Sequence, residues 1–168
     1  MDKKRRIAKD YDETAKDYDR RYSEIQREKF KILDGLNAKY TKGIILDHGC
    51  GSGLLAKHLN KRLQGCDLSF AMCKLASAHE DVACCDIDSL PYKSHSADAI
   101  FSFTAVQNLP DFSKVFKEAR RVLKKSGLFV CSVLNKVDLA ELRREAKLAG
   151  FSIKSESSCG EDVQFIFC

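Results

Sequence analysis

A short apolar strand that runs into a glycine-rich loop, GIILDHGCGSG at residues 43–53, constrains the fold of this chain more than any other stretch. Gly49, Gly51 and Gly53 alternate with small residues, so the backbone can turn sharply and a ligand can approach it closely. Asp47 lies at the carboxyl end of the strand, where open α/β sheets bind their ligands. The segment therefore predicts a ligand site at a strand-to-helix turn.

The spacing of these glycines excludes two common nucleotide-binding loops. A dinucleotide fingerprint needs its third glycine at a position that Leu54 occupies. A phosphate-binding loop needs Gly-Lys-Ser or Gly-Lys-Thr, and neither tripeptide occurs in the chain. The ligand is therefore expected to be neither a nicotinamide dinucleotide nor a nucleoside triphosphate.

The size and composition of the chain fit one globular domain. Of its 168 residues, 44% are hydrophobic and 32% are charged, which allows a single core. The only basic run, residues 3–6, is soon followed by acids and is interpreted as a solvated terminus. A formal charge of +5 leaves a nucleic-acid partner open without favouring it. No apolar run approaches a membrane span, and the polar start is unlike a secretory signal, so we expect a cytoplasmic protein.

The eight cysteines are expected to be reduced, because nothing in the sequence points to secretion. None forms a Cys-x-x-Cys pair, and most lie within apolar strand or helix patterns. We therefore interpret them as small buried hydrophobes and expect no metal site. The adjacent Cys84 and Cys85 are the exception to this interpretation.

Residues 1–40 are expected to form a helical cap. Tyr11 and Tyr18, seven residues apart, fall on one face of a helix. Ser23 and Gln26 have the spacing of a capping box, which predicts that a second helix begins there.

Strands and helices are expected to alternate in residues 41–168. Five apolar segments predict strands at residues 44–47, 63–67, 82–85, 99–103 and 128–134. Alternating residues from 151 to 167 then predict an antiparallel hairpin at the sheet edge. The fold class predicted is α/β, with one doubly wound, mostly parallel sheet of seven strands, helices on both faces and the antiparallel hairpin at its C-terminal end.

An acidic residue ends or follows each of the first three strands. Asp67 lies 20 positions after Asp47, the offset at which Rossmann-type sheets place a carboxylate for ribose hydroxyls. A helix-capping role is the alternative for Asp67. Asp86 follows the third strand. Because the carboxyl ends of parallel strands meet at one edge, the three carboxylates are expected there together.

The segment at residues 104–110 is expected to form a loop or short helix at the same edge. Gln107 and Asn108 would then face the cleft. Asp111 is the predicted cap of the next helix, and the lysines at residues 124–125 suit its carboxyl end.

Three segments in combination carry a family resemblance: LDHGCGSG at residues 46–53, GCDLS at 65–69 and CDIDSLPY at 85–92. They resemble the motifs of class I, seven-stranded S-adenosylmethionine-dependent methyltransferases. YDETAKDYD at 11–19 and RRVLKKSG at 120–127 further resemble the small-molecule branch typified by quinone-biosynthesis methyltransferases, although that branch usually has Pro-Gly where this chain has Ser126 and Gly127. The resemblance implies a Rossmann-like core, S-adenosylmethionine as cofactor and S-adenosylhomocysteine as product.

The resemblance also implies a role for individual residues. The backbone of residues 49–53 would hold the methionine part of the cofactor, with Asp47 near its ammonium group. Asp67 would accept from the ribose hydroxyls and Asp86 from the adenine amino group. Tyr11 or Tyr18 would close over the cofactor. The cofactor-binding set implied is Tyr18, Asp47, His48, Gly49, Cys50, Gly51, Gly53, Asp67, Leu68, Met72, Asp86, Ile87, Phe103 and Gln107.

No general base is evident in the sequence. Relatives often have a histidine where Gln107 or Asn108 stands here, and a neutral amide cannot take a proton. Either the acceptor is already a good nucleophile, or a base such as Tyr11, Tyr18 or Asp111 comes from elsewhere. A satisfied core position is favoured over a catalytic one for His48.

Three functions therefore stay open. The favoured one is methyl transfer to a small molecule. The second is an RNA or protein methyltransferase, because the protein is basic and TAVQNL at residues 104–109 resembles a ribosomal-RNA guanine methyltransferase. The third is a subunit that needs a partner, since the short strand at 82–85 would lie at the sheet edge, where another strand or a second copy could add.

Overall fold

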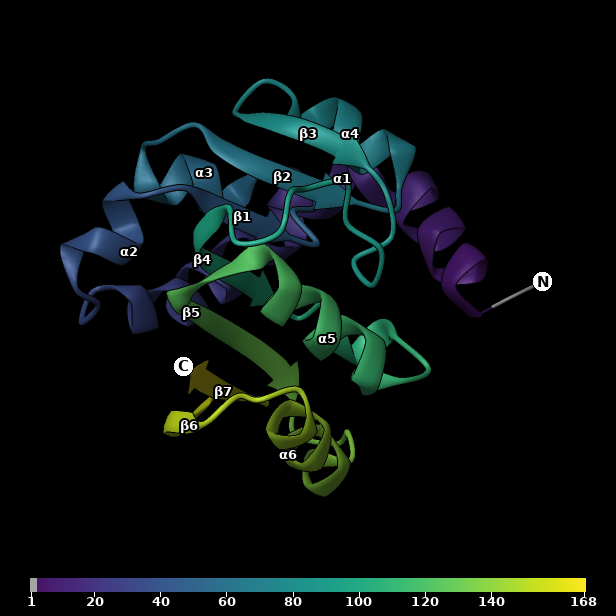
Figure 1. Ribbon diagram of the computed structural model, residues 1–168. Helices are drawn as coiled ribbons and strands as arrows, with labels where there is room; N and C mark the ends of the chain where they lie inside the picture. The colour runs from purple at the N-terminus through teal and green to yellow at the C-terminus, as the bar shows by residue number, and fades with distance from the viewer. Residues whose placement is uncertain (1–2) are drawn as a thin grey trace.

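The computed structural model describes residues 3–168, and its sheet confirms the predicted α/β fold (Figure 1). The strands described are β1 (Ile45–His48), β2 (Leu63–Asp67), β3 (Glu80–Cys84), β4 (Ala97–Phe103), β5 (Leu123–Leu134), β6 (Ile153–Cys159) and β7 (Asp162–Phe167). They form one seven-stranded sheet in the order β3-β2-β1-β4-β5-β7-β6. The pairs from β3 to β5 are parallel, whereas β7 runs antiparallel to both β5 and β6, as the predicted hairpin requires.

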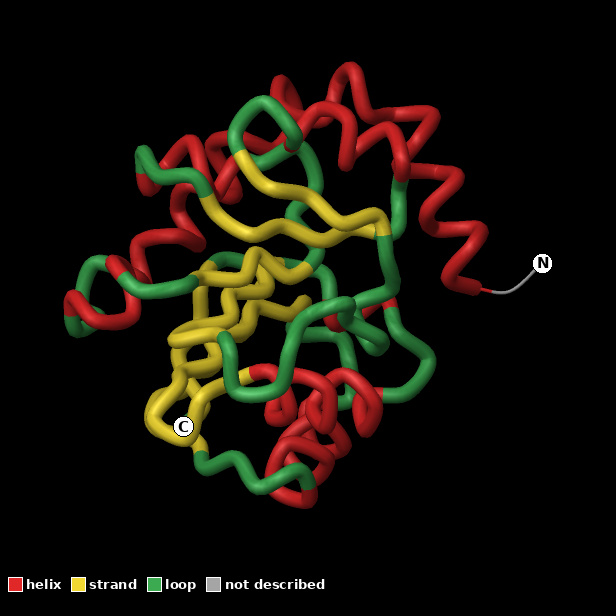
Figure 2. The backbone as a smooth tube through the Cα atoms, turned by 45° about the horizontal axis from the view of Figure 1, so that its top comes forward, coloured by secondary structure: helices red, strands yellow, loops and turns green. Residues whose placement is uncertain are grey.

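Helices cover both faces of this sheet, as Figure 2 shows with strands in yellow and helices in red. The helices are α1 (Lys3–Phe30), α2 (Ala38–Lys42), α3 (Leu54–Leu59), α4 (Phe70–Ala76), α5 (Phe112–Val122) and α6 (Leu139–Leu148), with short 3-10 turns η1 (Lys31–Leu33) and η2 (Val106–Asn108). On one face, α5 and α6 bury a cluster of phenylalanines. On the other, α3 and the end of α1 pack on β1, β4 and β5. Within residues 3–168, no helix is both long and apolar enough to cross a bilayer.

Most of the helical cap is one long helix, α1, so the expected start of a second helix with a capping box at Ser23 and Gln26 is wrong. Ser23 lies inside α1. The Gln26 amide is buried, and its Nε2 donates to the Tyr18 hydroxyl at 3.4 Å. Contacts of α1 with α3 and α4 stabilise the helix through this point, and tertiary packing overrides the local capping signal. Residues 1 and 2 of the expected cap lie outside the described part.

The expected helix end at the lysines of residues 124–125 is also wrong. Helix α5 ends at Val122, and both lysines lie in β5. Leu123 pairs with Ala97 of β4, and Lys124 Nζ lies 2.8 Å from Asp98 Oδ1. Strand pairing and this ion pair therefore hold the lysines in the sheet. The sequence pattern of lysines after a helix is the same whether they end the helix or begin the next strand.

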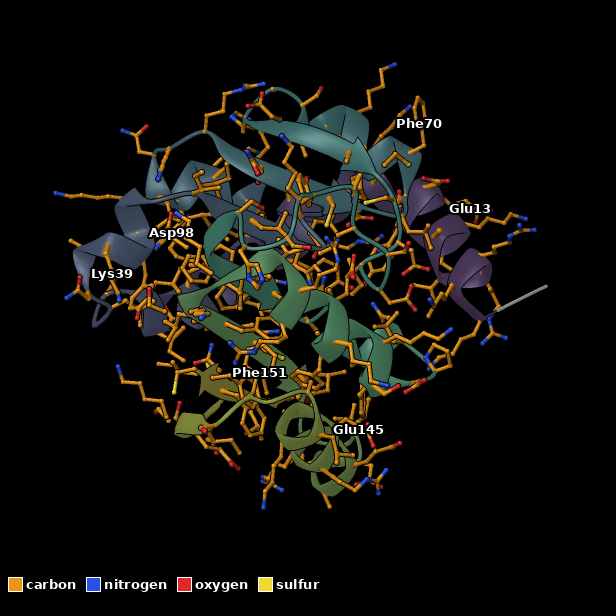
Figure 3. The ribbon with its side chains drawn as sticks, in the orientation of Figure 1. Glu13, Lys39, Phe70, Asp98, Glu145 and Phe151 are labelled. Atoms are coloured by element: carbon orange, nitrogen blue, oxygen red, sulfur yellow. The ribbon has the colours of Figure 1, made fainter. Side chains whose placement is uncertain are left out.

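Strand β3 forms an open edge of the sheet, as predicted, because among the described strands it pairs with β2 alone. Nearby on α4, the Phe70 side chain is 71% exposed and points away from the molecule (Figure 3). The Cys84 thiol is exposed and that of Cys85 is half-buried, while Cys50, Cys66, Cys73 and Cys131 are buried as expected. Cys159 is half-buried and Cys168 is exposed, so the expectation of buried cysteines is wrong for these two. All eight cysteines are free. A partner strand at this edge stays a prediction.

Truncation of Phe116 should measure how much the aromatic cluster stabilises the fold. The Phe116 ring lies between 5.4 and 6.0 Å from the rings of Phe129, Phe151 and Phe167, and the side chain is fully buried. Phe116→Ala should lower the free energy of unfolding in urea by about 3–5 kcal/mol. Leu148→Ala is the control, because that side chain is 70% exposed and its loss should change stability by less than about 0.5 kcal/mol. Equal effects would show that the cluster contributes no special stability.

Candidate functional site

The glycine loop after β1 is held in a conformation that other residues rarely adopt. The φ angles of Gly49, Gly51 and Gly53 are 80°, 54° and 82°. The backbone amides of Gly49 and Cys50 both donate to the Cys66 carbonyl at 2.9 Å, which fixes the loop to β2. Gly53 is the N-cap of α3. The loop therefore presents its backbone at the carboxyl end of β1, as the sequence predicts.

A cleft of about 670 Å³ opens beside this loop. It is bounded by α1, by the glycine loop after β1, by the ends of β2 and β4, and by the segments that follow β2, β3 and β4. Its lining residues are Lys4, Ile7, Ala8, Tyr11, Tyr18, Gly49, Gly51, Asp67, Leu68, Met72, Asp86, Ile87, Phe103, Thr104, Ala105, Asn108 and Leu109. Most members of the cofactor-binding set that the sequence implies thus lie around one cavity.

Asp67 links the loop to the start of α4. Its Oδ2 accepts from the Gly51 amide and its Oδ1 from the Ser69 amide, both at 2.9 Å. The helix cap itself is Ser69, whose hydroxyl accepts from the Met72 amide, so Asp67 is not the N-cap of α4. Burial raises the pKa of Asp67 although these amides oppose the shift. The carboxylate is preorganised at the wall of the cleft.

Asp86 is held by a residue from the far end of the chain. Lys4 Nζ donates to Asp86 Oδ2 at 2.7 Å and also to Asp88. Burial opposes the charge on Lys4, but the hydrogen bonds to Asp86 and Asp88 outweigh it and raise the pKa of the lysine. The expectation of a solvated basic terminus is therefore wrong for Lys4. No local signal could have revealed a contact between residues 82 positions apart.

The two candidate tyrosines, Tyr11 and Tyr18, lie together over the cleft from α1. Their rings pack edge to face with centroids 6.1 Å apart, and both line the cavity. The Tyr18 ring lies over Gly51, where an added Cβ would meet it at 3.8 Å. Burial raises the pKa of both phenols, so they keep their protons at neutral pH. They are placed to cover a ligand and to donate hydrogen bonds.

Five residues of the implied cofactor-binding set do not line the cleft. Asp47 and Cys50 line a second, smaller hollow, whereas Gln107, His48 and Gly53 line neither. Gln107 Oε1 accepts from the Leu134 amide at 2.8 Å, which ties η2 to β5, and its neighbour Asn108 lines the cavity instead. The expectation that Gln107 faces the cleft is therefore wrong. A sequence alone does not show which of two adjacent amides a short 3-10 turn directs inward.

His48 is fully buried and its Nε2 lies 2.7 Å from the Ile87 carbonyl, to which it donates. Burial lowers the pKa of His48 to about 4, so the ring is neutral at physiological pH. This geometry agrees with the core position favoured from sequence and not with direct contact to a ligand. The candidate base Asp111 is likewise away from the cleft, because it is the N-cap of α5 and accepts from the Ser113 amide at 2.7 Å.

A second, smaller hollow lies behind the glycine loop. It is lined by Tyr18, Gln26, Phe30, Asp47, Gly49, Cys50, Leu54, Leu55 and Phe103. Tyr18, Gly49 and Phe103 line both hollows, so the two are neighbours. The buried Gln26 Oε1 has no hydrogen-bond partner among the described residues. This hollow therefore offers an unpaired acceptor beside the Asp47 carboxyl group.

A buried ion pair that the sequence did not reveal borders the cleft at Thr104. Lys29 Nζ lies 2.9 Å from Asp162 Oδ2 and donates to Thr104 Oγ1 at 2.7 Å. Thr104 has a φ of 62°, and its amide donates to the Ser132 carbonyl. The end of α1, the end of β4 and the start of β7 are thus joined at one point. A strained backbone at the cleft wall is typical of functional sites.

Comparison with known proteins identifies the family of this arrangement. The methyltransferase domain family matches residues 46–131. A malonyl-[acyl-carrier protein] O-methyltransferase of Hahella chejuensis is 35% identical over 151 residues, which cover 84% of this chain and 54% of that protein. An uncharacterized protein of Methanocaldococcus jannaschii is 33% identical over 138 residues, covering 77% of this chain and 52% of that protein. The chain spans about half the length of these curated relatives.

One solved structure has the same fold over almost the whole chain. Magnesium protoporphyrin IX methyltransferase of Synechocystis PCC 6803, crystallised with bound S-adenosylmethionine, superimposes with a TM-score of 0.81. The match covers 99% of this chain and 97% of that one at 16% identity. At this identity the likeness shows the fold alone. The narrower resemblance to quinone-biosynthesis enzymes stays a prediction.

Alanine substitutions at Gly49 in the loop, and at two glycines elsewhere as references, should separate the cost of a positive φ from the cost of crowding. At Gly49 an added Cβ would overlap the Ala105 Cβ, and φ is also positive, so Gly49→Ala should cost more than about 2 kcal/mol of unfolding free energy. Gly160 has a positive φ but open space, so Gly160→Ala should cost about 1–2 kcal/mol. Gly35 has neither constraint, and Gly35→Ala should stay within about 0.5 kcal/mol in urea unfolding. A Gly49→Ala protein as stable as Gly35→Ala would contradict this account of the loop.

Proposed function

The chain belongs to the methyltransferase domain family and has the class I, Rossmann-like methyltransferase fold, and we propose that it transfers a methyl group from S-adenosylmethionine to a small molecule. The observation that carries this proposal is the cleft at the glycine loop. It combines carboxylates, apolar side chains and a bare backbone at the carboxyl ends of parallel strands. That is the place and chemistry expected for a nucleoside-containing ligand.

The residues of the two hollows fit the parts of this cofactor. Asp67 and Asp86 are acceptors for the ribose hydroxyls and the adenine amino group, and Leu68 and Met72 supply apolar surface for the purine. In the smaller hollow, the unpartnered Gln26 Oε1 lacks a donor and the Asp47 carboxyl group favours a cation, and the cofactor's ammonium group is both. The absence of a lysine from the glycine loop suits a cationic ligand that carries no phosphate.

The chain contributes to the reaction mainly by positioning the reactants and by excluding water from them. The bound cofactor supplies an electrophilic methyl group on its sulfonium. Tyr11 and Tyr18 exclude water from the cleft, and the Asp67 contacts to the amides of Gly51 and Ser69 hold the loop in place. Holding two reactants in line in a water-free site accelerates a displacement without any proton transfer.

The proposed acceptor is a small molecule whose nucleophile is already ionised or carries a lone pair. Among the described residues that line the cleft there is no histidine, and the phenols of Tyr11 and Tyr18 keep their protons. A carboxylate oxygen needs no base. This fits the name of the Hahella relative, a malonyl-[acyl-carrier protein] O-methyltransferase. Helix α1 covers the cleft and leaves it better suited to a small acceptor than to an RNA.

Removing the charge of the two cleft carboxylates should weaken cofactor binding. Asp67→Asn and Asp86→Asn should each lower the affinity for S-adenosylhomocysteine at least about tenfold, since a hydrogen bond to a charged group contributes about 1.5–3 kcal/mol. Isothermal titration calorimetry measures this, with thermal unfolding as the check that each variant folds. The matched control is Asp81→Asn, an exposed acid on β3 that pairs with Arg62 outside the cleft. Unchanged affinity in both cleft variants would refute the proposed cofactor site.

The class of acceptor can be read from where a labelled methyl group goes. Incubation with radiolabelled S-adenosylmethionine and fractionated cell extract should put the label into the low-molecular-weight fraction. With S-adenosylmethionine at saturating concentration at every pH, the initial rate on a purified carboxylate acceptor should stay level above the pKa of that acceptor, because no enzyme base has to ionise. Label in RNA, with binding that weakens steeply as salt rises, would favour the second function instead.

A further inference from the structure

Glu80, the first residue of β3, is a fully buried carboxyl group that no role described above explains. Neither of its oxygens has a hydrogen bond of ordinary geometry among the described residues, and the groups that approach them are the Asp47 carboxyl group, the Cys50 thiol and the Ala56 amide. Burying a carboxylate without a partner is costly, and such a group normally takes up a proton or shares one. The sequence did not single out Glu80, because a glutamate at the start of a short strand carries no local signal.

The sheet geometry directs the Glu80 side chain toward Asp47. Asp47 of β1 pairs with Gly65 of β2, and Gly65 pairs with Val82 of β3, so their side-chain positions share one face. Glu80 lies two residues before Val82 and therefore on the same face. A Cβ at position 65 would overlap Glu80 Oε2, which shows that the carboxyl group lies directly over the bare glycine. Gly65 thus leaves the space through which Glu80 reaches Asp47.

The surroundings of the pair are acidic. Burial raises the pKa of Asp47 well above its ordinary range, and the charge and hydrogen bond of Glu80 add to this shift. Burial likewise raises the pKa of Glu80 to about 7. The other titratable groups nearby are Asp67 from β2, Cys50 from the glycine loop, Cys73 from α4 and Tyr92 from the loop after β3. All are acids, so none of them offers a positive charge to the pair.

Asp47 also faces the second hollow, where the buried Gln26 Oε1 is unpartnered. Two acceptors that line one small cavity suit a group that has several N–H donors and a positive charge. In the proposed function this group is the ammonium of the methionine part of the cofactor. Its arrival would place a cation beside one member of the carboxyl pair.

We infer that Glu80 and Asp47 share one proton in the free protein, and that the ammonium group of the cofactor displaces this proton when it binds. The inference rests on the proposed function. The balance is simple: a carboxylic acid, a carboxylate and an ammonium group become two carboxylates and an ammonium group, and one proton leaves to solvent. Glu80 is therefore a positioning residue, which acts on the cofactor through Asp47.

The expected consequence is a cofactor affinity that rises with pH. The free protein binds the proton more tightly than the complex does, so cofactor binding releases it. The affinity for the cofactor therefore increases as the pH rises. Between pH 5.5 and 7.5 the affinity for S-adenosylhomocysteine should rise by up to about tenfold per pH unit. In this window the ligand's own amino group is mostly charged, because an α-amino group has a pKa of about 7.7–8.0. His48 is neutral throughout, with its pKa lowered to about 4 by burial.

The test is calorimetric titration of the folded protein with S-adenosylhomocysteine in buffers of different ionisation enthalpy, which counts the protons released. The wild-type protein should release a large fraction of one proton at pH 6.5. Glu80→Gln leaves Asp47 with a neutral partner that can donate to it, so release and pH dependence should both fall toward zero. The control Glu156→Gln, an exposed glutamate on β6, should behave as the wild type does.

Two results would overturn the inference. One is a wild-type binding enthalpy that does not depend on the buffer, a measurement that needs no variant to fold. The other is proton release by Glu80→Gln equal to that of the wild type. The proton would then come from another group, such as Asp67, which is unchanged in both proteins.

Methylthioadenosine, which has the adenosyl part but no ammonium group, separates this inference from the proposed function. It should bind without proton release. If both ligands bind and neither releases a proton, the inference of a shared proton is wrong and the proposed function still stands. If neither ligand binds at any pH, the proposed function fails.

Discussion

The fixed glycine turn after β1 is the constraint on which the rest of the site depends. Its positive φ angles and the two amides that donate to the Cys66 carbonyl place the loop backbone at the end of the sheet. Asp67 then bonds to the Gly51 amide and to the start of α4, so the second strand and the next helix are positioned by the same turn. The cleft and the smaller hollow behind the loop share this turn as a common wall.

Helix α1 covers part of the cleft at the carboxyl edge of the sheet. It contributes Lys4 to the carboxylates at the end of β3, two tyrosines to the roof of the cleft and Lys29 to the buried ion pair with Asp162. Because these contacts are spread over the length of the helix, α1 lines both hollows. In the proposed function, its two tyrosines keep water from the cofactor.

Much of the fold could be predicted, because hydrophobic periodicity marks buried strands and amphipathic helices wherever one face is covered. Some element boundaries differ from the prediction, because tertiary contacts decide them. The capping signal at Ser23 failed because α1 packs on α3 and α4, and the lysines after Val122 joined β5 because Lys124 pairs with Asp98. Gln107 was misplaced because a 3-10 turn directed Asn108 inward instead.

The sequence by itself determined the strand-to-helix turn, the carboxylates after the strands and the resemblance to one methyltransferase class. These are local features, since a glycine pattern and a strand end fix backbone geometry over a few residues. Only the tertiary structure decided which side chains meet. The contacts of Lys4 with Asp86 and of Glu80 with Asp47 join residues 82 and 33 positions apart, across helices and strands whose packing no local pattern encodes. Burial and charge depend on that packing, so the chemistry of the site was decided there.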